Sequence, residues 1–279
     1  MNKFKKGLVL AVTAAFVFMP MEAFAATSPT LGTVGSYSVL GHTTVTNTGP
    51  TTMPGDLGIS IGGSPVGFPP GIVGPPGTIR NAGDSLAAQN ADTAAFGFID
   101  QVCDTTYAGT KDLVASNLVA GVYCADAFTL TGTLTLSGSG VWIFKSASTL
   151  ITSGTANVIG GDPCSVWWRE VSSATIGTGT SLTGNILAST SIELQTGASL
   201  NGRALAQTGA VTLDTNTITG AACLSASSFS SSSAPSPKLP NTGINPSNGT
   251  NNLPGGTISA VIAIALISVA YLVRRNRIV

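Results

Sequence analysis

Five short segments between Thr129 and Gly220 repeat the same kind of sequence, and this repetition most limits how the chain can fold. The segments are TLTGTLTLSG from Thr129, TLITSGTANVIG from Thr149, TIGTGTSLTG from Thr175, IELQTGASLNG from Ile192 and VTLDTNTITG from Val211. Their starts are 20, 26, 17 and 19 residues apart (149−129, 175−149, 192−175, 211−192). Repeats of this length, each too small to fold alone, are typical of solenoids. Because β-branched stretches broken by glycine indicate strands joined by tight corners, we predict a mainly β fold, an irregular β-solenoid.

The residues before the repeats predict short strands and one irregular loop. We expect strands at Tyr37–Leu40, Thr43–Val45 and Leu57–Ile61. The segment Gly67–Gly77 reads GFPPGIVGPPG. We expect it to be neither helix nor sheet interior, because proline lacks the N–H that either would use.

One helix is predicted, from Asp84 to Val102, with Asn81 or Asp84 as its N-cap. Its apolar positions follow a helical 3–4 spacing: Ala88, Ala91, Ala95, Phe98, Ile99 and Val102. A helix this rich in alanine, with a single apolar stripe, is expected to pack along the side of the solenoid.

The N-terminus has the three parts of a secretory signal peptide. A basic start (Met1–Lys6) precedes an apolar stretch from Gly7 to Met19, and the small-x-small sequence Ala23–Ala25 follows. We predict a signal peptide at residues 1–25 and a secreted mature chain that starts near Ala26. A membrane anchor is the alternative, but the apolar stretch is short for crossing a bilayer.

The C-terminus predicts a tether outside the cell. Residues 225–256 form a Ser-, Pro- and Gly-rich linker, and within it stands the motif Leu239, Pro240, Asn241, Thr242 and Gly243. Residues 257–279 form an apolar segment that ends in a basic tail. This order resembles the LPxTG sorting signal, which a sortase-type transpeptidase cuts between Thr and Gly to join the protein to the cell envelope. Because residues 244–256 separate the motif from the apolar segment, a transmembrane helix held by positive-inside arginines is the alternative anchor.

Charge argues against a nucleic-acid partner. The mature domain holds five Lys or Arg and eleven Asp or Glu, a net charge of 5 − 11 = −6. Phosphate backbones require clustered cations, which this domain lacks. Charged residues are 9% of the chain, against roughly a quarter in ordinary globular proteins. Such a surface suits an uncharged partner, although a secreted β-protein with low-charge turns has a similar composition.

Four cysteines fit an oxidising compartment. None has the C-x-x-C spacing of a zinc or redox site, and three pairings are possible. We favour a local Cys103–Cys124 disulfide together with Cys164–Cys223, which would tie the last coil to the body of the domain. Both would be structural.

Several blocks in order resemble the ice-binding-like domain of microbial secreted proteins. They are Leu31–Gly58, Ala87–Asp92, Gly121–Tyr123, Leu130–Leu136, Ser172–Thr180 and Asn201–Ile218. The resemblance covers roughly residues 31–220, within a domain that we place at residues 26–224. It implies a discontinuous, right-handed β-solenoid of triangular cross-section with one long α-helix alongside. It also implies that the partner is the ice crystal surface, bound through one flat β-face, here expected to be rich in Thr and Ser; from the residues themselves we expect neither a cofactor nor a catalytic role.

The family's ice face carries a loose T-A/G-x-T/N pattern, and one row of this chain matches it. The predicted ice-binding residues are Thr152, Thr155, Thr178, Thr180, Thr196, Ser199, Thr215 and Thr217. A second row, on another face of the same coils, is Ser148, Ser173, Thr190 and Thr208. Threonine suits such a face because its side chain is stiff at χ1 and combines a methyl with a hydroxyl. It is also an ordinary strand residue, so the pattern alone does not identify the face.

Catalytic and metal chemistry find little support in the sequence. His42 is the sole histidine, so neither a Ser-His-Asp triad nor a histidine-rich metal site can be built. Asp162 and Glu170 are the pair of acids to consider for glycoside cleavage, but acids so close in sequence are more often solvated turn residues.

Three classes of function therefore stand. The first is ice binding by a protein tethered to the cell surface. The second is a non-catalytic adhesin or wall module, which an exposed tryptophan groove would favour. The third is a polysaccharide-active solenoid enzyme, which clustered acids in a cleft would favour.

Overall fold

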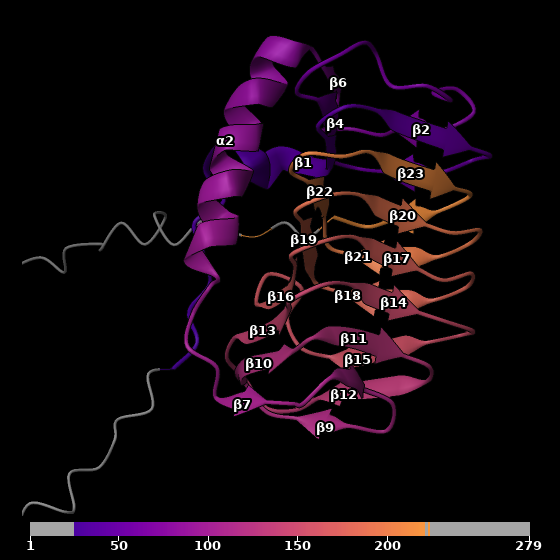
Figure 1. The fold of residues 1–279 in the computed structure, drawn as a ribbon. Helices are drawn as coiled ribbons and strands as arrows, with labels where there is room; N and C mark the ends of the chain where they lie inside the picture. Colours follow the sequence, from indigo (N-terminus) through magenta and orange to yellow (C-terminus); the bar gives the residue numbers. More distant parts are fainter. Residues whose placement is uncertain (1–24, 221–222, 224–279) are drawn as a thin grey trace, which may run out of the picture. The chain divides into compact units, whose positions relative to one another are not determined.

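Three parallel β-sheets wrap around an apolar core and form a three-sided β-solenoid, whose stacked coils are seen from the side in Figure 1. The computed structural model describes residues 25–220 and residue 223, all within one compact unit that spans residues 1–229. The predicted mainly β solenoid with a helix alongside is confirmed.

Seven coils contribute one strand to each sheet. Sheet A contains, in spatial order, β6 (Ile79–Arg80), β4 (Asp56–Ile59), β1 (Tyr37–Gly41), β22 (Ala204–Ala206), β19 (Asn185–Ala188), β16 (Val166–Glu170), β13 (Trp142–Ser146), β10 (Gly121–Ala125) and β7 (Thr105–Thr106). Sheet B contains β2 (Val45–Thr48), β23 (Val211–Asp214), β20 (Ile192–Leu194), β17 (Ala174–Ile176), β14 (Leu150–Thr152), β11 (Ala127–Leu130) and β8 (Thr110–Asp112). Sheet C contains β5 (Ile72–Val73), β3 (Thr52–Met53), β24 (Thr217–Ile218), β21 (Ser199–Asn201), β18 (Ser181–Thr183), β15 (Asn157–Gly160), β12 (Thr133–Leu136) and β9 (Asn117–Leu118). The end of the solenoid adds β4 and β6 to sheet A and β5 to sheet C.

The chain does not climb the solenoid in sequence order. Strands β1 to β6 build the coils at one end, after a 3-10 helix η2 (Gly32–Ser36). The helix α2 (Ala82–Phe98) then carries the chain along the side to the other end (Figure 1). Later coils stack back toward the start, until β22, β23 and β24 pair with β1, β2 and β3. The discontinuous path that the resemblance implied is therefore present.

All five predicted repeats contribute their first strand to sheet B. Registered partners show the coil lengths, because Thr129 pairs with Ile151, Ile151 with Thr175, Thr175 with Glu193, and Glu193 with Thr212. The coils are thus 22, 24, 18 and 19 residues long (151−129, 175−151, 193−175, 212−193). The irregular period reflects corners of different length.

Apart from its end strands β6 and β7, sheet A is buried on both faces. Its inner side chains stack in the core, where Phe144 lies between Tyr123 and Trp168 with ring centroids 5.5 Å and 4.2 Å away. Its outer side chains, such as Ile143 and Leu187, form a second apolar cluster with residues of α2. Strands covered on both faces read as nearly continuous apolar runs, which explains why β13 and β16 lack the alternation seen elsewhere.

Helix α2 begins at Ala82, two residues before the predicted Asp84, has Asn81 as its N-cap, and ends earlier than predicted. The side chain of Asn81 accepts a hydrogen bond from the backbone N–H of Asp84, as an N-cap does. Ala88 and Ala95 are buried against sheet A. The predicted end at Val102 is wrong: the helix stops at Phe98, and Val102 is 90% exposed.

Charged side chains fasten the end of the helix to sheet A. Asp100 forms ion pairs with Lys145 at 2.6 Å and with Arg169 at 3.3 Å. The hydrogen bond from Lys145 and the nearby Arg169 guanidinium lower the pKa of Asp100. The chain after α2 is therefore held against β13 and β16.

Two expected segments near the N-terminus need correction. The strand expected at Thr43–Val45 is β2, which starts only at Val45. The Pro-rich segment Gly67–Gly77 is not wholly irregular, because Ile72 and Val73 form β5 and pair with β3. This two-residue strand lies between the prolines and forms the edge of sheet C. Because no further described strand pairs with its outer side, the N–H groups that the prolines lack are not needed there.

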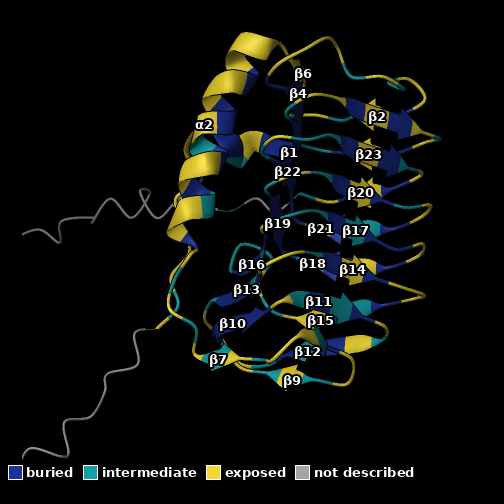
Figure 2. Ribbon diagram, in the orientation of Figure 1, coloured by how far each residue is buried: buried dark blue, intermediate teal, exposed yellow. Residues whose placement is uncertain are grey.

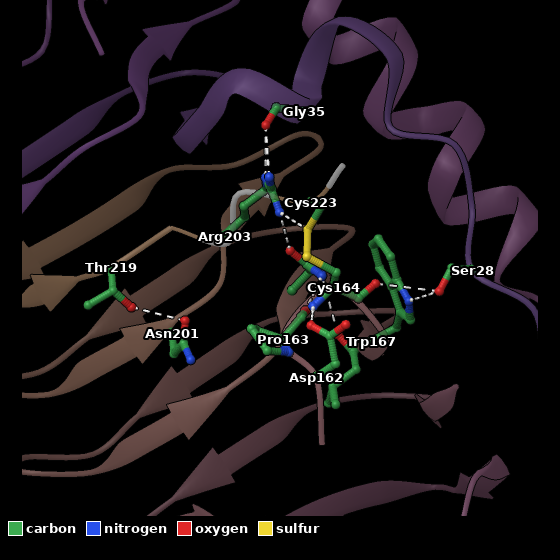
Figure 3. The surroundings of a disulfide bond; sticks show 12 residues. Ser28, Gly35, Asp162, Pro163, Cys164, Trp167, Asn201, Arg203, Thr219 and Cys223 are labelled. Atoms are coloured by element: carbon green, nitrogen blue, oxygen red, sulfur yellow. Dashed lines mark hydrogen bonds between the residues drawn. A yellow bond between two sulfur atoms is a disulfide. The ribbon is translucent and has the colours of Figure 1, made fainter. Parts of the chain in front are cut away.

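Both favoured disulfides are confirmed. Cys103 bonds to Cys124 with the Cα atoms 5.9 Å apart, and Cys164 bonds to Cys223 with the Cα atoms 5.3 Å apart. Figure 3 shows Arg203 beside the second bond, where it donates to the Gly35 carbonyl and to the Cys223 sulfur. Desolvation of this guanidinium lowers the pKa of Arg203 to about 10.

The predicted terminal segments lie almost wholly outside the described residues. They are the signal peptide, the linker with Leu239–Gly243, and the apolar segment 257–279. Among the residues that the structure does describe, no helix is long and apolar enough to cross a membrane.

Candidate functional site

Only two of the three solenoid faces are open to solvent. Helix α2 and η2 pack over sheet A, while sheets B and C carry no covering element within the described residues. Figure 2 shows the strands of sheet B alternating between buried and exposed residues. A flat partner must therefore meet sheet B or sheet C.

A central row on sheet B takes one outward residue from each strand. Registered pairs connect its members across all seven strands: Thr46, Thr212, Glu193, Thr175, Ile151, Thr129 and Asp112. Their neighbours along the strand point inward, as Val211 and Leu213 do beside Thr212. Because parallel strands lie ~4.8 Å apart, methyl and hydroxyl groups recur at that spacing along the row.

Two further rows flank the central one, because residues two positions apart on a strand share a face. The preceding row is Thr44, Ala210, Ser191, Ser173, Thr149, Ala127 and Thr110. The following row is Thr48, Asp214, Gln195, Ser153, Thr131 and Val114, and it is interrupted between Gln195 and Ser153 by the buried Gly177. We call the three rows together the sheet B face; its charged members are Glu193, Asp214 and Asp112.

Sheet C presents two outward rows, here called the sheet C face. The first row is Ile72, Thr52, Thr217, Ser199, Ser181, Asn157 and Thr133. The second row is Thr219, Asn201, Thr183, Ile159, Thr135 and Asn117. A hollow of about 370 Å³ interrupts this face where β5, β3 and β24 meet, and its lining includes Met53, Pro54 and Ile72.

Two of the predicted ice-binding residues are wrong, because they lie inside the solenoid. Thr152 is 2% exposed and Thr180 is fully buried. Their hydroxyl oxygens lie 2.9 Å apart, and the Thr152 hydroxyl also accepts from the N–H of Gly177 at 2.8 Å. Both hydroxyls thus form hydrogen bonds at the corner between sheets B and C, and neither can contact a binding partner outside the protein.

The other six predicted residues are exposed or half-buried but do not share one sheet face. Thr155, Thr178, Thr196 and Thr215 are exposed at the corner between sheets B and C. Ser199 and Thr217 belong to the first row of the sheet C face. The Thr196 hydroxyl donates to the Asp214 carboxylate, which also accepts from Thr215 at 3.0 Å.

The alternative row lies mostly at the corner between sheets A and B. Ser148, Thr190 and Thr208 are exposed there, and the Thr208 hydroxyl donates to the carbonyl of Ser189 at 2.6 Å. Ser173 directly precedes β17 and belongs to the sheet B face.

The central row of the sheet B face was missed by pattern matching. A signal for it does exist in the sequence: the buried residues Leu150, Ala174, Ile192 and Val211 each stand one position before a member of the row. Counting outward positions from these apolar residues, rather than from the threonines, would have found the row.

The alternative chemistries lack the geometry they require. All three tryptophans of the chain, Trp142, Trp167 and Trp168, are buried, so none lines an exposed groove. Glu170 is fully buried in the core, which corrects its expected place in a solvated turn, whereas Asp162 is exposed. These two acids do not face a common cleft.

Histidine and metal chemistry have no site among the described residues. The Nδ1 atom of His42 lies 2.8 Å from the hydroxyl of the buried Ser60. The described part of the chain contains no group of His, Cys, Asp or Glu side chains that could hold a metal ion.

The fold and its open faces define a helix-braced β-solenoid that offers flat rows of short hydroxyl side chains. The Ice-binding-like family model matches residues 39–219, and the chain belongs to that family. An ice-binding protein of Nostoc sp. (strain HG1) is 43% identical over 227 residues, which cover 78% of this chain and 83% of that protein.

Solved structures of ice-binding proteins are also similar to this chain. The crystal structure of an ice-binding protein from the Antarctic ascomycete Antarctomyces psychrotrophicus is 37% identical, with a TM-score of 0.65 over 69% of this chain and 98% of that one. An ice-binding protein from an Antarctic biological consortium is 33% identical, with a TM-score of 0.67 over 72% of this chain and 96% of that one.

Proposed function

We propose that this protein binds ice through the sheet B face. The observation that carries the proposal is the row of registered outward residues across all seven strands, four of which are threonines: Thr46, Thr212, Thr175 and Thr129. A rigid β-stack presents them at a fixed spacing. Stiff threonine side chains lose little conformational freedom when they meet an ordered lattice of water.

Shape favours sheet B over sheet C as the main binding face. The sheet B face is three outward residues wide, whereas the sheet C face is two wide and is hollowed at one end.

Three carboxylates lie within the proposed face: Glu193 is exposed, whereas Asp112 and Asp214 are half-buried. Glu193 is exposed in the central row, between Thr175 and Thr212. A carboxylate keeps strongly bound water that an ice lattice does not accommodate. We therefore expect contact with ice to be weakest at β20, and replacing Glu193 tests this directly.

We further propose that the mature protein is secreted and starts at Ala26. Ala26 packs against the apolar cluster beneath α2, and the N–H of Thr27 donates to Gln101 at 3.0 Å. The indole N–H of Trp167 donates to the Ser28 hydroxyl at 3.1 Å. The residues directly after the predicted cleavage site are thus part of the folded domain, and two disulfides suit an oxidising compartment.

Tethering at the cell surface completes the proposal. Sortase cleavage at Thr242 would leave a linker of about 18 residues, which at full extension reaches ~60 Å, so the domain could extend beyond the envelope to hold the cell to ice. Deleting residues 239–279 would then release the protein into the medium and abolish adhesion of cells to ice. Unchanged adhesion would contradict the tether.

Thermal hysteresis tests the binding face. A double variant with Thr175→Tyr and Thr212→Tyr places two bulky rings on the sheet B face, and we expect it to lose most of the freezing gap. The control, Asn90→Tyr, adds a ring on the exposed side of α2 and should keep the gap. If both proteins kept it, ice would bind elsewhere on the molecule.

A further inference from the structure

Part of the sheet C face is free of charge and is built like an ice-binding surface. On β12, β15, β18 and β21, away from the hollow, each strand presents two outward residues separated by one buried leucine or valine. The pairs are Thr133 and Thr135, Asn157 and Ile159, Ser181 and Thr183, and Ser199 and Asn201. No member of the set is charged.

The geometry of these eight residues is regular. Thr133 pairs with Asn157, Asn157 with Ser181, and Ser181 with Ser199, so the register is unbroken across four strands. Residues two apart on a strand are separated by ~6.6 Å and neighbouring strands by ~4.8 Å. The result is a flat two-row array of short side chains, most of which carry a hydroxyl or amide group.

The array joins the sheet B face without a break. The corner between the two sheets carries the exposed residues Thr155, Thr178 and Thr196. No described element packs on this corner. Two flat faces therefore meet along a line of threonines, and the sheet C side of this edge is uncharged.

We propose that this part of sheet C is a second ice-contacting facet, which together with the corner lets one molecule contact two ice surfaces. This inference rests on the proposed function of sheet B. We infer ice as the occupant because these eight side chains are uncharged. Ice is a neutral lattice of water and offers no charge with which charged side chains could pair.

Other occupants fit the facet poorly. A second copy of the chain would require an apolar interface core, and Ile159 is the only large apolar side chain of the set. A glycan would be expected to stack on exposed aromatic rings, and all three tryptophans are buried. Both occupants are distinguished from ice by the experiment below.

The test compares how much protein enters slowly growing ice for three variants of the full mature protein. The first carries Thr175→Tyr and Thr212→Tyr on sheet B. The second carries Thr183→Tyr and Asn201→Tyr on sheet C. The third combines all four changes, and Asn90→Tyr on α2 is the matched control.

If both sheet B and this part of sheet C contact ice, we expect partial loss of ice incorporation in the first and second variants, and complete loss in the combined variant. If the sheet B variant alone lost all incorporation, the inference would be overturned while the proposed function stood. The same holds if adding the sheet C changes removed nothing further. If the sheet B variant behaved like the control and the sheet C variant lost all incorporation, the proposed face itself would be wrong. Two other results would also contradict ice binding by sheet C. The sheet C changes would then lower incorporation only above the concentration at which the protein dimerises, or only when glycan is added.

Discussion

A buried carboxyl group inside the solenoid makes the stability of this protein depend on pH. Glu170 ends β16 with its side chain in the core, where its register neighbours are Ser146 and Ala188. The Ser146 hydroxyl donates to one carboxyl oxygen, and the other oxygen has no hydrogen-bond partner. Burial raises the pKa of Glu170 from 4.5 to about 8, so the group is largely protonated at neutral pH.

The direction and size of the effect follow from linkage. Below pH 4.5 the carboxyl group is protonated in both folded and unfolded chains, and it imposes no penalty. As the pH rises to about 8, only the unfolded chain ionises, so the free energy of unfolding falls over that range and levels off above it. Since each unit of pKa is worth ~1.4 kcal/mol, the difference between 4.5 and about 8 sets an upper limit of ~5 kcal/mol. Asp92, whose pKa burial raises to about 7, acts in the same direction.

Denaturant unfolding with intact disulfides, at pH 5 and at pH 9, measures this loss. We expect Glu170→Gln to remove several kcal/mol of the difference between the two conditions, because glutamine accepts from Ser146 without ionising. Glu193→Gln removes the same formal charge from the surface and serves as the control. A Glu170→Gln protein that lost as much stability between pH 5 and pH 9 as the parent would refute the reasoning.

Three further changes separate binding from stability. Replacing the exposed Glu193 by threonine is expected to widen the thermal hysteresis gap, because it removes a charge from between Thr175 and Thr212 in the central row; a narrower or unchanged gap would count against sheet B. Thr152→Ala should lower the free energy of unfolding by about 1–3 kcal/mol, since the N–H of Gly177 loses its acceptor, with the hysteresis of the folded protein unchanged. Replacing both Cys164 and Cys223 by alanine should cost ~4 kcal/mol, measured by chemical denaturation, because the bond closes a loop with a sequence separation of 59; a cost near zero would show that the unfolded chain gains little freedom.

The solenoid and the helix could be predicted because each leaves a local signal, whereas the cysteines allowed three pairings, of which the favoured one is present. The repeated β-branched segments predict stacked strands, and the alanine-rich stretch after Asn81 predicts a helix. The end of α2 was predicted wrongly because Val102 fits the apolar spacing although it lies beyond the last turn of the helix. Spacing alone does not show where a helix stops.

The orientation of individual threonines could not be predicted in the same way. A strand reverses its faces at every residue, so an error of one position moves a side chain from solvent to core. In β14 the usual polarity is also inverted, because Ile151 is exposed while Thr152 is buried. The buried hydroxyl is stable only through Thr180, which lies on the next coil. Such a pairing depends on corner lengths that vary between coils and leave no pattern in the sequence.

Partition of the purified mature protein between slowly growing ice and the remaining liquid tests the central claim most directly. Ice that advances slowly excludes ordinary solutes, whereas a protein that binds its surface is overgrown and retained. We predict that the protein enters the ice at or above its concentration in the liquid, and that Thr175→Tyr with Thr212→Tyr strongly lowers the share of protein found in the ice. A protein excluded from ice as completely as an ordinary solute would contradict it.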